Sequence, residues 1–368
     1  MSNPGHQPQL QSEQQNFAKG YPFVSVVMPV RNEAGFIERS VGAVLAQDYP
    51  RTRMEVIIAD GLSDDGTREV LAVLQRQHPN LSLIDNPGKI VSKGLNAALR
   101  LVKGEVIIRV DGHCEVARDY VRRCVSRLAE HNTDCVGGPL ETIGETYTAR
   151  AVAAAMSSSF GVGGSAFRVA GSKEHFVDTV PFPAYRRQAI RRAGEFDEEL
   201  VRNQDDEYNY RVRKLGGRIL LAPDIRSRYY SRGSLSKLGR QYFQYGYWKV
   251  RVMQKHPRQM QPRQFVPLLF VMALLLLFLT SPFFGVSKFL LSATLVAYAI
   301  LNLAGSVSAA HRTKWSLFPL LPIAFTTIHL AYGSGFLLGL VRFWNRWGDR
   351  ETPAARTAGN IGPVSTCR

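Results

Sequence analysis

The segment Asp111-Gly112-His113 places a carboxylate and an imidazole two positions apart, with a flexible glycine between them. It follows Val106 to Val110, a short run rich in β-branched residues that predicts a buried strand. Open α/β sheets bind their ligands at the carboxyl ends of such strands. A carboxylate oxygen and an imidazole nitrogen at that place could hold a divalent cation against a phosphate-bearing ligand. The alternative is a turn whose aspartate caps the next helix.

The strand before Asp111 is one of several that the sequence predicts. Between residues 23 and 111, short apolar runs alternate with segments whose apolar residues recur every three or four positions. The expected strands are residues 24–28, 56–59, 81–84 and 105–110. This alternation predicts an α/β fold with a Rossmann-like, mostly parallel sheet.

Polar residues follow three of these expected strands. Asn32 and Glu33 come after the first strand, Asp60 follows the second, and Asp111 and His113 follow the fourth. Because the carboxyl ends of parallel strands line one crevice, these side chains could meet a single ligand there. Each one is also common in caps and turns, so the prediction depends on their joint placement. These turns contain neither a G-x-G-x-x-G fingerprint nor a P-loop sequence.

A second acidic cluster, Asp205-Asp206-Glu207, opens an expected helix after Gln204. Acids in the first turn complement the helix dipole, which is one interpretation of the cluster. A carboxylate held near a sugar hydroxyl is also what a general base requires. The residues alone leave both interpretations open.

The C-terminal third is strongly apolar. Residues 265–286 and 289–310 contain no charged side chain, and each stretch is long enough to cross a bilayer. A third stretch, residues 317–341, has the length of a span but contains His329, prolines and several glycines. We therefore expect two or three spans. Three spans would place the basic residues 342–350 outside, against the positive-inside tendency, unless the third stretch is a re-entrant hairpin.

The chain has a formal net charge of +16, and its basic residues cluster between residues 226 and 263, just before the first apolar stretch. Such a cluster marks the cytoplasmic side of a membrane and attracts anionic lipid. Aromatic residues interleaved with it suit a helix lying in the membrane interface, and they are Tyr242, Phe243, Tyr245, Tyr247 and Trp248. A membrane partner is favoured over nucleic acid.

The ends of the chain and its cysteines complete the expected organisation. Residues 1–20 are rich in glutamine and have no secretory pattern, which predicts a disordered tail. The four cysteines lack short paired spacings, which fits a reducing compartment and no zinc knuckle. The expected parts are a tail (1–20), a sheet domain (21–235), interfacial helices (236–264), a transmembrane region (265–341) and a basic polar tail (342–368).

These motifs together resemble glycosyltransferase family 2, whose catalytic domain has a GT-A fold. The matching elements are residues 26–33, the turn from Asp60 to Thr67, Asp111-Gly112-His113 at the place of the family's D-x-D, and residues 194–207 at the acceptor-side element. Residues 160–165, 177–180 and 240–249 are similar to the ExoA subgroup of succinoglycan biosynthesis proteins. The resemblance implies a GT-A catalytic domain followed by a C-terminal α-helical transmembrane region.

The resemblance also implies roles on the donor side. Asp111 would lie near the ribose and diphosphate of a nucleotide-sugar. His113 stands where the family has its metal-binding second aspartate, so His113 and Asp111 would hold a divalent cation, Mn²⁺ or Mg²⁺. The nucleotide itself would be bound by Pro29, Asn32, Glu33 and Asp60.

On the acceptor side, Asp205 matches the family's catalytic base. Gln204 replaces the acid that usually precedes this base, which leaves Asp206 open as the alternative. The residues expected to face the acceptor and the membrane are Gln241, Tyr245, Trp248 and Lys249.

The expected activity is an inverting transfer of a hexose from UDP-glucose or a similar nucleotide-sugar to a lipid-linked saccharide, in exopolysaccharide or cell-surface glycan synthesis. The expected location is the inner (plasma) membrane, as a multi-pass protein with a cytoplasmic catalytic domain that contacts membrane lipids and no nucleic acid. A processive polysaccharide synthase is one alternative, although two or three spans are few for a sugar channel. A non-enzymatic sensor of nucleotide-sugars is another, and the acids at 205–207 argue against it.

Overall fold

The computed structural model describes residues 20–163, 167, 173–231 and 233–348. The expected N-terminal tail and most of the C-terminal one lie outside these residues. The chain divides into two compact units whose segments alternate along the sequence. Of the described residues, 20–140 and 173–228 belong to the sheet unit, and 141–163, 167, 229–231 and 233–348 belong to the helical unit. The described residues from 141 to 167 thus group with the C-terminal helices, and the expected domain boundaries stay predictions.

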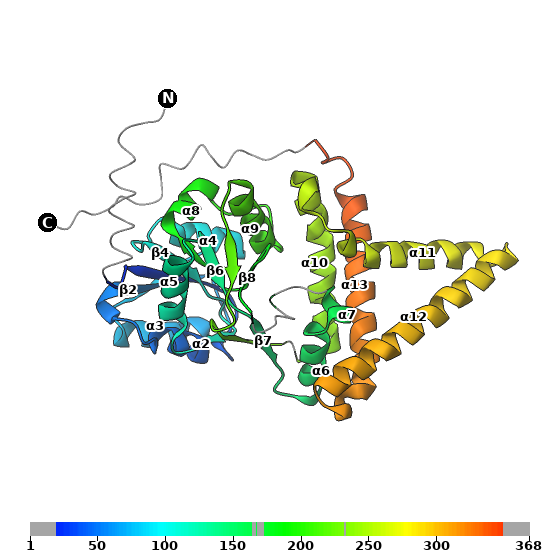
Figure 1. Cartoon of the computed structure of the whole chain (residues 1–368), viewed down its shortest axis with the longest axis horizontal. Coiled ribbons are helices and arrows are strands. Elements are labelled where there is room, and N and C mark those ends of the chain that lie inside the picture. The colour runs from blue at the N-terminus through cyan, green and yellow to red at the C-terminus, as the bar shows by residue number, and fades with distance from the viewer. Residues whose placement is uncertain (1–19, 164–166, 168–172, 232, 349–368) are drawn as a thin grey trace. The chain divides into compact units, whose positions relative to one another are not determined.

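An eight-stranded sheet forms the core of the sheet unit (Figure 1). Its strand order is β3-β2-β1-β4-β9-β6-β10-β8. The first half is parallel and consists of β3 (Leu81–Asp85), β2 (Met54–Asp60), β1 (Val24–Val30) and β4 (Val106–Arg109). The second half mixes directions and consists of β9 (Ala184–Arg186), β6 (Cys135–Gly137), β10 (Ile219–Leu221) and β8 (His175–Phe176). The predicted α/β class with a mostly parallel sheet is confirmed.

Burial explains why the short apolar runs became central strands. Every residue of β1 and β4 is buried, as expected for strands with helices on both faces of a parallel sheet. The helices of this unit are α2 (Ile37–Leu45), α3 (Thr67–Gln77), α4 (Val91–Leu99), α5 (Tyr120–Glu130), α8 (Arg187–Ala193) and α9 (Gln204–Lys214). A short strand, β5 (Cys114–Val116), follows the Asp-Gly-His turn, and the unit boundaries fall at β7 (Leu140–Ile143) and β11 (Ser227–Tyr230).

The helical unit contains two short helices, α6 (Tyr147–Met156) and α7 (Ser159–Val162), and four long ones. The long helices are α10 (Leu235–Lys255), α11 (Val266–Thr280), α12 (Gly285–Arg312) and α13 (Leu321–Arg342). Three stretches of the described residues are long and apolar enough to cross a membrane, namely Pro262–Thr280, Gly285–Arg312 and Trp315–Arg342. In Figure 1, α11 and α12 form a hairpin, and α10 lies beside α13.

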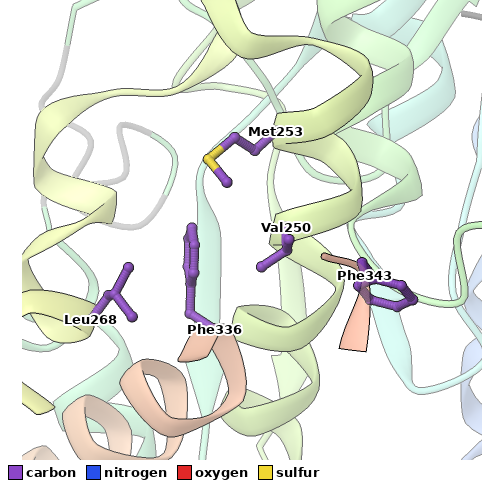
Figure 2. Packing of buried hydrophobic residues seen from close by; sticks show 5 residues of the cluster. All are labelled: Val250, Met253, Leu268, Phe336 and Phe343. Atoms are coloured by element: carbon purple, nitrogen blue, oxygen red, sulfur yellow. The ribbon is translucent and has the colours of Figure 1, made fainter. Parts of the chain in front are cut away.

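A cluster of buried apolar side chains joins three of these helices. Figure 2 shows Val250 and Met253 of α10, Leu268 of α11, and Phe336 of α13 with Phe343 just after it. Phe336 is fully buried, and removing such apolar surface from water is the main stabilising contribution of a cluster like this. The first turns of α11 are therefore fixed against the α10–α13 pair.

Candidate active site

The adjacent strands β1 and β4 bring Glu33 and His113 together. The two strands pair in parallel, so the loops that follow them leave the same edge of the sheet. His113 Nδ1 lies 2.8 Å from Glu33 Oε1, and both side chains are largely buried. Gly112 permits this approach, because a Cβ atom there would lie 3.0 Å from Val30 Cγ1 and 3.1 Å from Glu33 Cγ. Since an ionised carboxylate only accepts hydrogen bonds, His113 Nδ1 is the donor.

Arg109, the last residue of β4, connects the strand end to α9. Its Nη2 atom donates to Asp111 Oδ1 at 2.8 Å, and its Nη1 atom contacts Asp205 Oδ1. The guanidinium is buried, with only 7% of the side chain exposed, whereas 38% of the Asp205 side chain is exposed. Two carboxylates that are distant in the sequence are thus held around one buried cation. Asp205, and not Asp206, is the acid that contacts Arg109.

This ion-pair group sets the charge balance of the site. Burial raises the pKa of Asp205, the nearby carboxylates of Asp111 and Asp206 add to the rise, and Arg109 opposes it. Burial disfavours the charge on Arg109, but the carboxylates of Asp111 and Asp205 outweigh it and raise the pKa of the guanidinium. Asp205 is therefore a partly accessible carboxylate with more affinity for a proton than an ordinary aspartate.

Helix α9 is anchored so that its first turn faces this group. Asn203 adopts a left-handed backbone conformation (φ 62°) just before the helix. Glu207 forms a bidentate ion pair with Arg211, at 2.6 and 3.0 Å, which stabilises the first turns. Gln204 is buried, and its Oε1 atom has no hydrogen-bond partner within the described part of the chain. A buried amide oxygen of this kind is available to a ligand or a water molecule.

The turn after β2 is held by its own hydrogen bonds. The fully buried carboxylate of Asp60 accepts from Ser63 Oγ at 2.6 Å, from Ser63 N at 3.1 Å and from Arg68 Nη1 at 2.7 Å. Asn32, with φ 54°, exchanges hydrogen bonds with Asp64, donating from Nδ2 and accepting at Oδ1. Asp60 therefore fixes the turn after β2 and the start of α3, whereas Asn32 ties the loop after β1 to that turn. Any role of either residue toward a nucleotide would come in addition.

The other expected residues lie in two places. Pro29 is buried inside β1, opposite Ala59 of β2. The acceptor-side residues lie on α10 of the helical unit, where Gln241 Nε2 donates to Tyr245 Oη at 2.9 Å. Trp248 Nε1 donates to Gln244 Oε1 at 3.1 Å, and Lys249 is buried.

Sequence reasoning missed Arg109. The available signal was a charged residue inside an otherwise apolar strand, because such a residue is seldom buried without an ionic partner. Nothing in the spacing indicated that the partners would be Asp111 and Asp205, which come from different elements.

Comparison with known proteins identifies the family of the chain. Residues 25–194 match the family model described as glycosyl transferase family 2. The succinoglycan biosynthesis protein ExoA of Rhizobium meliloti (strain 1021) is 31% identical over 323 residues, which cover 87% of this chain and 96% of that protein. The chain belongs to glycosyl transferase family 2. Its curated relatives are glycosyltransferases, and the chain is one of them.

One further curated relative and one solved structure extend the comparison. A dolichyl N-acetyl-alpha-D-glucosaminyl phosphate 3-beta-D-2,3-diacetamido-2,3-dideoxy-beta-D-glucuronosyltransferase of Methanococcus voltae is 26% identical over 328 residues, covering 87% of this chain and 98% of the relative. The mannosyltransferase PcManGT of Pyrobaculum calidifontis, solved with GDP-Man and Mn²⁺, has a TM-score of 0.55 at 21% identity, covering 91% of this chain and 95% of that one. This likeness establishes the GT-A fold.

Asp111 and His113 are the residues at the strand ends whose types suit a divalent cation. Among the described residues, no group of three or more His, Cys, Asp or Glu side chains could hold a metal ion. Asp111 and His113 supply one carboxylate and one imidazole, and the Nδ1 atom of that imidazole faces Glu33. Cations that are completed by substrate phosphates use only one or two protein ligands.

Proposed function

We propose that this family 2 enzyme transfers a hexose from a UDP-linked nucleotide-sugar to a lipid-linked saccharide, with inversion at the anomeric carbon. The observation that carries the proposal is the contact of Asp205 with Arg109, beside Asp111. It joins a candidate base on α9 to the strand end at which α/β sheets bind phosphate-bearing ligands. The family membership and the names of the relatives, which include succinoglycan biosynthesis and a dolichyl phosphate sugar transferase, support the same substrate classes.

Asp205 acts as the general base. It takes the proton of an acceptor hydroxyl while that oxygen forms the new bond to the anomeric carbon and the nucleoside diphosphate leaves from the opposite face. The raised pKa of Asp205 suits this role, because a base with more proton affinity than ordinary aspartate removes the proton more readily. Arg109 keeps the Asp205 carboxylate oriented and limits the rise of its pKa. Asp206 remains the alternative base.

Asp111 and His113 would hold a divalent cation together with the donor diphosphate. Such a cation supplies positive charge where negative charge develops on the leaving diphosphate. Glu33 orients His113 by accepting a hydrogen bond from its Nδ1 atom, as outer-shell carboxylates do for metal-binding histidines. The nucleotide is bound at the carboxyl ends of β1 and β2, where Pro29 and Asp60 belong to the strands and Asn32 to the loop after β1.

The acceptor reaches the enzyme at the membrane. The three apolar stretches of the helical unit and the basic residues of α10 support association with the inner membrane, with the catalytic domain on the cytoplasmic side. Gln241, Tyr245, Trp248 and Lys249 are proposed to face the saccharide–lipid acceptor from α10.

Transfer assays test the proposal. Membranes containing the protein are supplied with Mn²⁺ and radiolabelled UDP-glucose, UDP-galactose or GDP-mannose, and label in the lipid extract is measured. Replacing Asp205 with Asn should lower turnover by about 10²–10⁴, because the amide cannot accept the proton. The matched control is Asp206→Asn, which changes the adjacent acid on the same helix and should leave most of the turnover.

Three results would contradict parts of the proposal. Near-normal turnover of a folded Asp205→Asn protein would remove Asp205 as the base, and a large loss in Asp206→Asn alone would transfer that role. A ladder of product lengths in place of one added sugar would indicate processive synthesis. Binding of a nucleotide-sugar without transfer to any acceptor would indicate a sensor.

A further inference from the structure

Helix α13 is apolar enough to cross a membrane, but it is covered far more than the other two candidate spans. In its most apolar window 39% of the residues are buried inside the protein, against 11% for the α11 and α12 stretches. Much of the cover comes from α10, which lies beside α13 (Figure 1). The orientation of α13 in a membrane is therefore tied to that of α10.

Glycines bring the two helices into direct backbone contact. A methyl group at Gly246 of α10 would overlap the carbonyl oxygen of Tyr332, and one at Gly335 of α13 would overlap that of Phe243. Small residues at such positions let two helix backbones approach closely. The pair is therefore a rigid element, since neither helix can turn about its own axis without losing these contacts.

The contacts extend along most of both helices. Near one end, a Cβ atom at Gly239 would lie 3.3 Å from Thr327 Cγ2, and at the other end Gln254 Nε2 donates to the Phe343 carbonyl at 2.7 Å. Because the residue numbers of the contacting residues rise together along both helices, α10 and α13 run in the same direction. The shared stretch of α10 is about 24 Å long at 1.5 Å per residue, most of the roughly 30 Å of a hydrocarbon core.

α10 is too polar to cross a bilayer with α13. Charged side chains within the hydrocarbon region are costly and rare. Arg240 is exposed at the first turn of the shared stretch, and Arg251 is fully buried against the ring of Phe343. The basic residues of this helix are Lys237, Arg240, Lys249, Arg251 and Lys255. A membrane crossing by α13 would take the three that lie within the shared stretch, Arg240, Lys249 and Arg251, into the bilayer beside it.

We propose that the α11–α12 hairpin is the membrane-crossing part of the chain, and that the α10–α13 pair lies on the surface of an anionic bilayer. The chain then enters and leaves the membrane from one face. The basic residues before α11 and those after α13 share that face, which agrees with the positive-inside tendency. The apparent third span is an interfacial helix, whose apolar composition reflects burial against α10 and α11 on one side and lipid on another.

The uncovered surface of α13 fits a lipid surface. Its large exposed apolar residues recur along the helix, and they are Ile323, Leu330, Leu338 and Val341. Beside them α10 exposes Lys237 and Arg240, whose charge complements anionic headgroups. Apolar residues that enter the acyl boundary next to basic ones are typical of helices lying in the interface plane.

Labelling of single cysteines tests the crossing. In a Cys367→Ser background, Arg258→Cys precedes α11, Gly285→Cys lies at the hairpin turn, and Asn345→Cys follows α13. A membrane-impermeant maleimide is added to spheroplasts or to inverted vesicles. We expect positions 258 and 345 to react in the same preparation and position 285 in the other. Reaction of 345 together with 285, or of 285 together with 258, overturns the proposal. The remaining cysteines, Cys114, Cys124 and Cys135, are buried.

A depth measurement tests the interfacial position of α13 separately. Bimane is attached to Ile323→Cys, Leu330→Cys and Leu338→Cys in vesicles containing phosphatidylglycerol brominated at shallow or deep carbons. A helix in the interface plane gives the same shallow quenching at all three positions. A span gives deep quenching at the middle position, which overturns the proposal. Leu295→Cys on α12 is the matched control and should be quenched by the deep bromines.

Discussion

The two units each bury an arginine, and they partner it in different ways. In the sheet unit Arg109 contacts two carboxylates, Asp111 and Asp205, of which Asp205 is partly open to solvent. In the helical unit Arg251 contacts the amide oxygen of Gln254 and the ring of Phe343. The first arginine is balanced by ionised groups, whereas these contacts of the second are with neutral ones.

This difference suggests a catalytic role for the group around Arg109 and a structural role for the group around Arg251. Charged groups with a raised pKa that are partly open to solvent, such as Asp205, are typical of functional sites. Arg251 and Gln254 lie beside the chain that leaves the C-terminus of α13, where Gln254 donates to the Phe343 carbonyl and a positive charge favours the helix dipole. Substitutions in the first group should alter rate at constant stability, and substitutions along α10–α13 should do the reverse.

The largest effect on stability should come from the glycine contacts of the helix pair. In Gly246→Ala, the added methyl group meets the backbone of Tyr332, which no side-chain rotation can relieve. We expect a loss of about 1–3 kcal/mol, as for other overpacked sites. Thermal unfolding in nanodiscs measures it. Gly239→Ala is the matched control on the same helix, since its methyl meets only the Thr327 side chain and alanine favours the helix. Equal stability of the two variants would refute the close packing.

The sequence predicted the strands better than the contacts between elements. Where strands and helices alternate, an apolar run such as Val24 to Met28 is stable as a central strand, because it must be covered on both faces. The strand ends then follow, and with them the placement of Glu33, Asp60 and Asp111. The pairing of Glu33 with His113 requires β1 and β4 to be neighbours, which strand order decides and local pattern does not.

The helical unit shows the same limit more strongly. Apolar composition gave three stretches suited to a membrane, because length and hydropathy are local properties. It gave no indication that α10, with its basic and aromatic residues, would pack along α13. That contact depends on glycines that meet backbone far away in the chain, since Gly246 meets Tyr332, 86 residues later, and Gly335 meets Phe243, 92 residues earlier. Periodicity reveals which face of a helix is apolar and not which helix covers it.

A smaller effect, on rate alone, is expected at the strand ends. In Glu33→Gln, the amide is a weaker acceptor for His113 Nδ1 and can also donate to it, so the imidazole is held less firmly in its orientation. Turnover should fall about 10- to 100-fold, as for other outer-shell partners of metal-binding histidines, and half-saturation by Mn²⁺ should need more metal. Glu38→Gln, exposed on α2, is the control. A loss of stability with unchanged Mn²⁺ dependence would mean that the Glu33–His113 pair has a structural role, as the group around Arg251 does.

The smallest effect is a shift of pH dependence. Asp205 must be ionised to accept a proton, so kcat/KM should fall on acidification through the pKa of Asp205, which burial raises above the ordinary aspartate range. Arg109 opposes that rise, so Arg109→Gln should move the acidic limb to higher pH while lowering the rate at its plateau. Arg118→Gln, which removes an exposed arginine from the same unit, should leave the limb in place. If Arg109 had only a structural role, Arg109→Gln would lower the amount of folded enzyme and leave the acidic limb at the same pH. An unmoved limb in Arg109→Gln would therefore mean that Asp205 is not the titrating base.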